Sequence, residues 1–169
     1  MSDSFNLDRR QILALGAGAA AAASQAACAQ TTSRATDAPD LSGTSILVTG
    51  SSSGFGRFGV EYYARQGAKV FATMRNIPRP EADELRDLAS SDGLDISVIE
   101  IDVTSDAQVE AGVANALAAT DGKLDVLINN AGIGISGPVE LQDMEATQLA
   151  FDTNVFGCHR MARAVLPAM

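Results

Sequence analysis

Residues 49–56, TGSSSGFG, form a glycine-rich turn between a β-branched apolar run (TSILVT, 44–49) and a stretch with helical spacing. Gly50 allows a sharp exit from a strand, Gly54 lets the backbone approach a pyrophosphate, and Gly56 lets the helix pack closely on a sheet. Serine hydroxyls and the partial positive charge of a helix start favour an anion here. The spacing, G-x-x-x-G-x-G, differs from the G-x-G-x-x-G fingerprint, and a plain β–α turn is the alternative. The candidate phosphate-binding residues are Gly50, Ser51, Ser52, Ser53, Gly54, Phe55 and Gly56.

Strand-like and helix-like patterns alternate after this turn. Apolar runs typical of buried strands cover 44–49, 68–74, 95–101 and 124–130. Helical patterns cover 54–66, 80–93, a segment after a predicted capping box at Ser105 and Gln108, and a long helix from about Met144 to Leu166. The alternation predicts an α/β fold: a doubly wound parallel sheet of the Rossmann type, incomplete, with strand order beginning 3-2-1-4.

Composition narrows the function. The chain has 169 residues, a formal net charge of -9 and only two lysines, so no basic surface is available for nucleic acid. The length suits one domain with a sizeable core. His159, Cys28 and Cys158 are too few to assemble a His/Cys zinc site, and no metal site is expected.

The first 29 residues look like a targeting segment rather than part of the fold. The stretch DRRQIL (8–13) resembles the twin-arginine export signal of bacteria, an apolar run follows, and Ala27-Cys28-Ala29 resembles a cleavage site. The run is too short to span a bilayer comfortably. We therefore expect an export signal at 1–29, a polar linker at 30–43, a domain at 44–169 and a periplasmic or exported protein. A lipid anchor at Cys28 and a cytoplasmic protein with an unstructured tail are the alternatives.

Three motifs together resemble the short-chain dehydrogenase/reductase family. TGSSSGFG is similar to its TGxxxGxG signature, NNAG (129–132) to its second signature, and FDTNVFG (151–157) to the segment with its catalytic asparagine. They occur in the family's order, and the resemblance covers about 43–169. The stretches TGSSSGFGR, VFATMRN and NNAGIGISGPVE are most similar to the 17β-hydroxysteroid and retinol dehydrogenase-like subgroup. The resemblance implies hydride transfer between a nicotinamide cofactor and a small-molecule carbonyl or secondary alcohol.

The resemblance also suggests which cofactor is used. In NAD-binding proteins a carboxylate after the second strand binds the ribose 2′-hydroxyl, whereas this chain has Arg75 there. An arginine can pair with a 2′-phosphate, with Arg57 as a second candidate, so NADP is favoured over NAD. The alternative is a solvated surface arginine.

Other roles follow from the family's motifs. By the resemblance, Asp102 and Val103 contact the adenine ring. The alternative for Asp102 is an acidic residue that simply precedes the capped helix. By the resemblance, the adenosine side of the cofactor is contacted by Asn130, Ala131 and Gly132. These residues would also stabilise the sheet. Asn154 takes the catalytic asparagine's role, which is to bind a water through a distorted backbone. Asparagine disfavours helix interiors, and an exposed residue without a role is the alternative.

The family's serine and Tyr-x-x-x-Lys do not occur in these 169 residues: Tyr62 and Tyr63 are followed four residues later by Gln66 and Gly67. We therefore expect the N-terminal part of a longer enzyme, inactive by itself. A non-catalytic NADP-binding or sensing module is the alternative. In the full-length form, the long helix is expected to contribute to a homo-oligomer.

Overall fold

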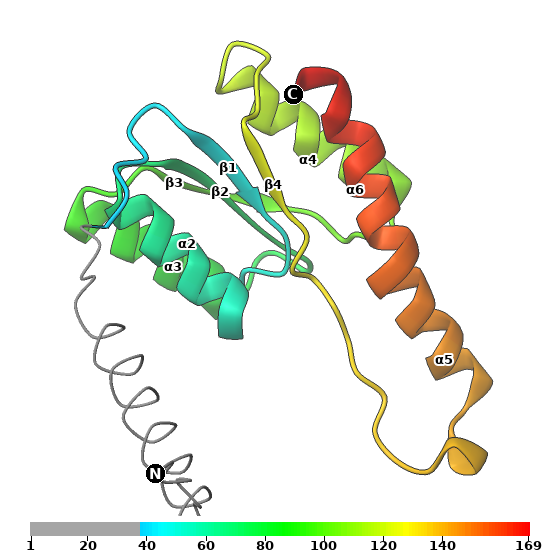
Figure 1. Cartoon of the computed structure of the whole chain (residues 1–169). Coiled ribbons are helices and arrows are strands. Elements are labelled where there is room, and N and C mark those ends of the chain that lie inside the picture. Colours follow the sequence, from blue (N-terminus) through cyan, green and yellow to red (C-terminus); the bar gives the residue numbers. More distant parts are fainter. Residues whose placement is uncertain (1–37) are drawn as a thin grey trace, which may run out of the picture. The chain divides into compact units, whose positions relative to one another are not determined.

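The computed structural model describes residues 38–169. The predicted export signal, the alternative lipid site at Cys28 and the first part of the predicted linker lie outside the described residues. The described part of the chain contains one four-stranded sheet with all strands parallel (Figure 1). Its strands are β1 (Ser45–Val48), β2 (Lys69–Met74), β3 (Ile96–Glu100) and β4 (Val126–Ile128). Their order is β3-β2-β1-β4, which confirms the predicted sheet.

Three strands, β1, β3 and β4, end one or two residues earlier than the apolar runs predict. At β1 and β4 the residues that follow hydrogen-bond to each other. Pairing of β1 with β4 stops at Val48 and Ile128. Thr49 and Asn130 then bind each other: the Asn130 N–H donates to Thr49 Oγ1 at 2.9 Å, and Asn130 Nδ2 donates to the Thr49 carbonyl at 2.9 Å. The sheet therefore passes directly into the turns at its carboxyl edge.

The helices begin and end close to the predicted places. They are α2 (Gly54–Arg65), α3 (Pro80–Asp92), α4 (Asp106–Ala118), α5 (Met144–Phe151) and α6 (Gly157–Val165). Pro80 opens α3, and Gly93 with φ 65° ends it. Only half of the predicted capping box forms on α4. Ser105 Oγ accepts from the Gln108 N–H at 3.4 Å, but Gln108 Oε1 accepts from the Asp102 N–H and not from that of Ser105.

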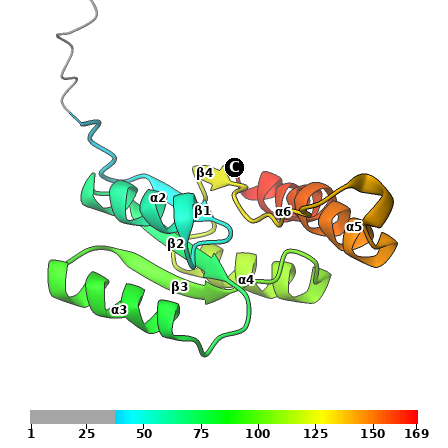
Figure 2. The ribbon, with the colours of Figure 1, turned by 90° about the horizontal axis from the view of Figure 1, so that it is seen from below.

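Helices cover both faces of the sheet (Figures 1 and 2). On one face Val60 of α2 and Leu85 of α3 pack in a buried cluster with alternate strand residues such as Val70. On the other face Val109 of α4 and Met161 of α6 pack around Phe71. The side chains of β1 are buried throughout, as its unbroken apolar run predicts. The helices bury both faces of the sheet and leave the carboxyl ends of its strands accessible.

The predicted single helix from Met144 to Leu166 is interrupted. A π-helical segment, Asp152–Phe156, separates α5 from α6, and a short 3₁₀ turn, Leu166–Ala168, follows. Helical periodicity in the sequence does not reveal one extra residue per turn, so the prediction was wrong on this point. π-Helical segments are rare and frequently mark functional sites. Within residues 38–169, no helix is long and apolar enough to cross a membrane.

Candidate functional site: a pocket at the carboxyl edge of the sheet

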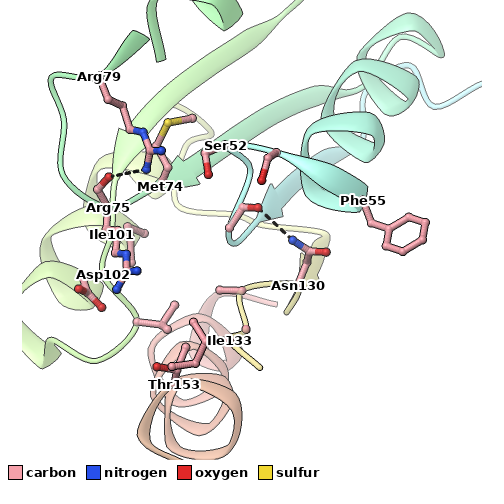
Figure 3. A pocket seen from close by; sticks show the side chains of 15 residues that line it. Ser52, Phe55, Met74, Arg75, Arg79, Ile101, Asp102, Asn130, Ile133 and Thr153 are labelled. Carbon is pink, nitrogen blue, oxygen red and sulfur yellow. Dashed lines mark hydrogen bonds between the residues drawn. The ribbon is translucent and has the colours of Figure 1, made fainter. Parts of the chain in front are cut away.

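A pocket of about 340 Å³ lies where the four strands end. Each strand contributes the residues that follow it, as ligand sites in open α/β sheets require. The lining residues are Gly50, Ser52, Ser53, Phe55, Met74, Arg75, Arg79, Ile101, Asp102, Val103, Asn130, Ala131, Gly132, Ile133 and Thr153. Ten of these residues are among the predicted cofactor-binding residues, and Figure 3 shows labelled members around one space.

The glycine turn has a backbone that only glycine allows. Gly50 and Gly54 adopt φ values of 67° and 56°, in the left-handed region. A Cβ on Gly50 would lie 2.7 Å from Ala131 Cα, and a Cβ on Gly56 would overlap the Gly50 carbonyl oxygen and Asn130 Nδ2. The turn, the start of α2 and the end of β4 are therefore in direct contact.

The N-terminus of α2 differs from those of α4 and α5. Ser105 and Asp143 cap α4 and α5 with side-chain hydrogen bonds, whereas Ser53 makes none at α2. No acidic residue lies in the first turn of α2. The first N–H groups of this helix therefore lack a side-chain acceptor, and they start beside the pocket that Ser53 lines. This arrangement fits an anion such as a pyrophosphate.

The three serines of the turn have different environments. Ser52 and Ser53 line the pocket. Ser51 is fully buried; its hydroxyl donates to the Val48 carbonyl at 2.9 Å and its N–H to the Thr73 carbonyl at 2.9 Å. Ser51, one of the predicted cofactor-binding residues, does not line the pocket, and its two hydrogen bonds hold the turn against β1 and β2.

Gly54 and Phe55 form the start of α2 through their backbone, and the Phe55 side chain does not pack in the pocket. The Phe55 side chain is 90% exposed, and Figure 3 shows its ring directed away from the other labelled residues. Gly54 and Gly56 do not line the pocket, although they shape the helix start that does.

Asn130 fastens the turn to the end of β4. Its Nδ2 donates to the carbonyls of Thr49 and Gly50, at 2.9 and 3.1 Å (Figure 3 shows a bond of this group). The Thr49 hydroxyl in return accepts from the N–H groups of Asn130 and Ala131, both at 2.9 Å. Asn130 therefore has the sheet-steadying role that the sequence suggested, and its backbone borders the pocket together with Ala131 and Gly132.

Two arginines form the basic side of the pocket. Arg75 is exposed and makes no ion pair within the described part of the chain. Arg79, which the sequence analysis missed, lines the same pocket and donates to the Arg75 carbonyl at 3.3 Å (Figure 3). A second arginine only four residues after Arg75 was the sequence feature that could have predicted its place in the pocket. Arg57, the other arginine considered, binds Glu61 and Glu84 instead and does not line the pocket.

Glu81 holds Arg79 through two hydrogen bonds. Arg79 Nε and Nη2 each donate to a Glu81 carboxylate oxygen at 2.9 Å. The hydrogen bonds from Arg79 lower the pKa of Glu81 from 4.5 to about 2, and the same pairing raises the pKa of Arg79. The pair is therefore ionised throughout the neutral pH range.

Asp102 and Val103 lie where β3 ends. Asp102 Oδ1 accepts from the Thr104 N–H and hydroxyl at 2.9 and 2.7 Å, a turn that fixes the carboxylate beside the pocket. Arg160 donates to the Val103 carbonyl at 3.3 Å. Val103 is buried and presents an apolar wall together with Ile101, another residue that sequence analysis missed.

Asn154 lies outside the pocket lining, in the middle of the π-helical segment. Its side chain forms a two-point pair with one residue: the Ile133 N–H donates to Asn154 Oδ1, and Asn154 Nδ2 donates to the Ile133 carbonyl, both at 2.8 Å. The backbone distortion implied by the resemblance is present. Asn154 also fixes the extended segment that follows β4. Cys158 is half-buried and His159 is exposed, which agrees with packing and surface positions.

Arg160 ties the π-helical segment to the rest of the protein. Its Nη2 donates to Asp152 Oδ1 and its Nε to Asp106 Oδ1, both at 2.8 Å. The pKa of Arg160 is raised, first by Asp152 and then by Asp106. Asp152, the start of α4 and the loop with Val103 are thereby held together.

A doubly wound parallel sheet with a glycine turn and an uncapped helix at its carboxyl edge defines a nucleotide-binding fold of the Rossmann type. The chain belongs to the short-chain dehydrogenase family, whose model, described as "short chain dehydrogenase", matches residues 44–169. The resemblance inferred from the motifs is thus confirmed.

The known relatives include members of the expected subgroup. Human retinol dehydrogenase 8 is 38% identical over 127 residues, which covers 73% of this chain and 39% of that protein. Mouse 17-beta-hydroxysteroid dehydrogenase type 1 is 36% identical over 131 residues, 75% of this chain and 37% of that protein. The crystal structure of NADPH-bound carbonyl reductase from chicken fatty liver matches with a TM-score of 0.70 and 30% identity, over 76% of this chain and 52% of that one. The chain spans less than half the length of these two curated relatives.

Proposed function

We propose that this chain binds NADP(H) and serves an oxidoreductase that transfers hydride between NADP(H) and a carbonyl or secondary alcohol. The observation that carries the proposal is the uncapped start of α2 after the glycine turn, in one pocket with Arg75 and Arg79. The free N–H groups at the start of α2 can bind a pyrophosphate. The guanidinium groups of Arg75 and Arg79 can bind a 2′-phosphate. The related carbonyl reductase was solved with NADPH bound, which supports this cofactor.

The remaining residues have roles in holding the same molecule. Asp102 offers a fixed carboxylate to the adenine amino group, and Val103 an apolar surface to the ring. Asn130, Ala131 and Gly132 border the adenosine side. When bound, the nicotinamide supplies or accepts the hydride. Asn154 is placed by its pair with Ile133 to hold the backbone distortion that the family uses to bind a water.

Acid–base chemistry needs groups that these 169 residues do not contain, since no Tyr-x-x-x-Lys occurs in them. The chain accordingly contributes cofactor binding and Asn154 to the proposed reaction. The names of the relatives, a retinol and a 17-beta-hydroxysteroid dehydrogenase, favour an apolar alcohol or carbonyl as substrate of the complete protein.

Titration with NADPH and NADH tests the proposal directly. The chain has no tryptophan, so the fluorescence of the reduced nicotinamide can be followed without energy transfer from indole. We expect NADPH to bind at least about 10-fold more tightly than NADH, because hydrogen bonds to charged groups contribute about 1.5–3 kcal/mol. Folded protein that binds neither nucleotide would contradict the proposal.

Replacing Glu81 by glutamine is expected to tighten NADPH binding about 3-fold and to leave NADH binding unchanged, since exposed ion pairs are weak. The substitution frees Arg79 and removes a negative charge beside the phosphate site. Because the folded pKa of Glu81 is lowered to about 2, its pairing stabilises the fold above the ordinary value of 4.5 and is lost only as the pH falls through about 2. Titration of Glu81 should therefore not change the gain between neutral pH and about pH 5, and any change in this range comes from the 2′-phosphate, whose second pKa is about 6.

Glu84→Gln is the matched control for this experiment. Glu84 pairs with Arg57, which does not line the pocket, so the same loss of one negative charge should not change the ratio of NADPH to NADH affinity. Equal gains in both variants would show that net charge alone acts.

A further inference from the structure

The loop between β2 and α3 carries both arginines of the pocket. Arg75 directly follows β2, and Arg79 directly precedes Pro80, the first residue of α3. Arg79 Nη1 donates to the Arg75 carbonyl at 3.3 Å (Figure 3). The two guanidinium groups can therefore bind the same phosphate only while the backbone between them keeps its conformation.

The middle of this loop contains a strained turn. Asn76 has φ 59°, in the left-handed region, which is unfavourable for a residue with a side chain. Such a conformation persists only where the surrounding structure holds it. The Asn76 side chain is exposed, so the contacts that hold the turn come from the residues beside it.

Glu100, the last residue of β3, supplies such a contact from the neighbouring strand. Its Oε1 accepts from the Ile77 N–H at 3.1 Å. In the strand ladder Glu100 pairs with Met74, so its side chain extends past the end of β2 to reach the loop. The Ile77 side chain packs against the buried cluster under α2 and α3. The residue midway between the two arginines is therefore fixed at its backbone and at its side chain.

The carboxylate of Glu100 acts on the loop backbone and not on an arginine. Within residues 38–169 Glu100 makes no ion pair, and it does not line the pocket. Glu81, in contrast, binds the Arg79 guanidinium directly. The contribution of Glu100 is therefore to the geometry of the loop.

We infer that Glu100 is a positioning residue for cofactor selection, whose carboxylate holds the loop in the conformation that brings Arg75 and Arg79 together at the 2′-phosphate. The inference rests on the proposed function and adds a residue that lies outside the pocket lining. Without this hydrogen bond the loop would gain other conformations, and binding of the phosphate would have to order it again. The loss should therefore affect nucleotides that carry a 2′-phosphate.

Three substitutions at this position separate the hydrogen bond from the charge. Glu100→Ala removes both, Glu100→Asp keeps the charge on a side chain one methylene shorter, and Glu100→Gln keeps an oxygen acceptor of the same reach without the charge. We expect Glu100→Ala and Glu100→Asp to bind NADPH and 2′,5′-ADP about 3- to 5-fold more weakly, because one hydrogen bond is lost. Their affinities for NADH and 5′-AMP should not change. Glu100→Gln should bind NADPH at least as tightly as the original chain.

An effect of charge alone would give a different pattern. Glu100→Ala and Glu100→Gln would then tighten NADPH binding equally, and Glu100→Asp would resemble the original chain. That pattern, or equal weakening of all four ligands by Glu100→Ala, would overturn the inference while the proposed function stands. An original chain that binds none of the four ligands contradicts the proposed function itself.

Hydrogen exchange of the Ile77 amide, followed by NMR without nucleotide, tests the hydrogen bond separately from binding. Exchange should be about 3- to 5-fold faster in Glu100→Ala and unchanged in Glu100→Gln, because only the first variant lacks an acceptor. Equal exchange in Glu100→Ala and the original chain would also overturn the inference.

Glu110→Ala is the matched control, since it makes the same substitution at an exposed residue of α4 outside the pocket. It should change neither the four affinities nor the exchange of the Ile77 amide. Weakening of NADPH binding by Glu110→Ala to the same degree would contradict a specific role of Glu100.

Discussion

Gly56→Ala is expected to lower the free energy of unfolding by about 3 kcal/mol and to abolish detectable NADPH binding, because the new methyl group overpacks a rigid site. A Cβ at this position would overlap the Gly50 carbonyl oxygen and Asn130 Nδ2. Gly50 itself is closely packed, since a Cβ on it would lie 2.7 Å from Ala131 Cα. Relief therefore requires separating α2 from the turn that it follows. Urea unfolding followed by circular dichroism, together with the NADPH titration, measures both effects.

Gly59→Ala provides the control within the same helix. A Cβ at Gly59 would approach only the ring of Tyr63, at 3.2 Å, and a side-chain ring can move. Replacing a helix-interior glycine by alanine stabilises a helix by about 1 kcal/mol, so this variant should be as stable as the original chain or more so. Equal destabilisation by both substitutions would show that the close approach at Gly56 is not the cause.

Arg75→Asp is expected to change the ratio of NADPH to NADH affinity by about 100-fold in favour of NADH, the sum of a lost charged hydrogen bond and a gained neutral one. Arg75 is exposed at the end of β2 and free of ion pairs within residues 38–169, so it is available to a phosphate. An aspartate there would repel the 2′-phosphate and could accept from a ribose 2′-hydroxyl instead. Titration of the variant with both nucleotides gives the ratio.

Arg86→Asp controls for the change in net charge. Arg86 pairs with Asp83 on α3 and lies outside the pocket. Because the charge change is identical, any general electrostatic effect on the dinucleotide should appear in both variants, while the change in preference should appear only at position 75. An unchanged preference in Arg75→Asp would remove Arg75 from the phosphate site.

Sequence alone was sufficient for the sheet and for most of the pocket, because both depend on local patterns. Unbroken apolar runs locate buried strands, and the rule that ligands bind at their carboxyl ends brings Gly50, Arg75, Asp102 and Asn130 together. Their relation to one another follows from topology and needs no knowledge of side-chain packing.

Features that depend on tertiary hydrogen bonds could not be predicted in this way. The break in the long helix accompanies the pair between Asn154 and Ile133, residues 21 positions apart. Ser51 looked like the other serines of its turn, yet its N–H bonds to Thr73 on a neighbouring strand. Thr153 lies in the unpredicted π-helical segment and lines the pocket. Neither hydropathy nor spacing carries this information.

The bonds from Asn130 to the carbonyls of Thr49 and Gly50 have a consequence for affinity. They join the glycine turn after β1 to the loop after β4. The glycine turn therefore cannot change conformation without breaking hydrogen bonds at the end of β4. Its conformational entropy is lost when the protein folds, before any nucleotide arrives. Association then requires little further ordering, which is the energetic advantage of a receptor that is already shaped for its ligand.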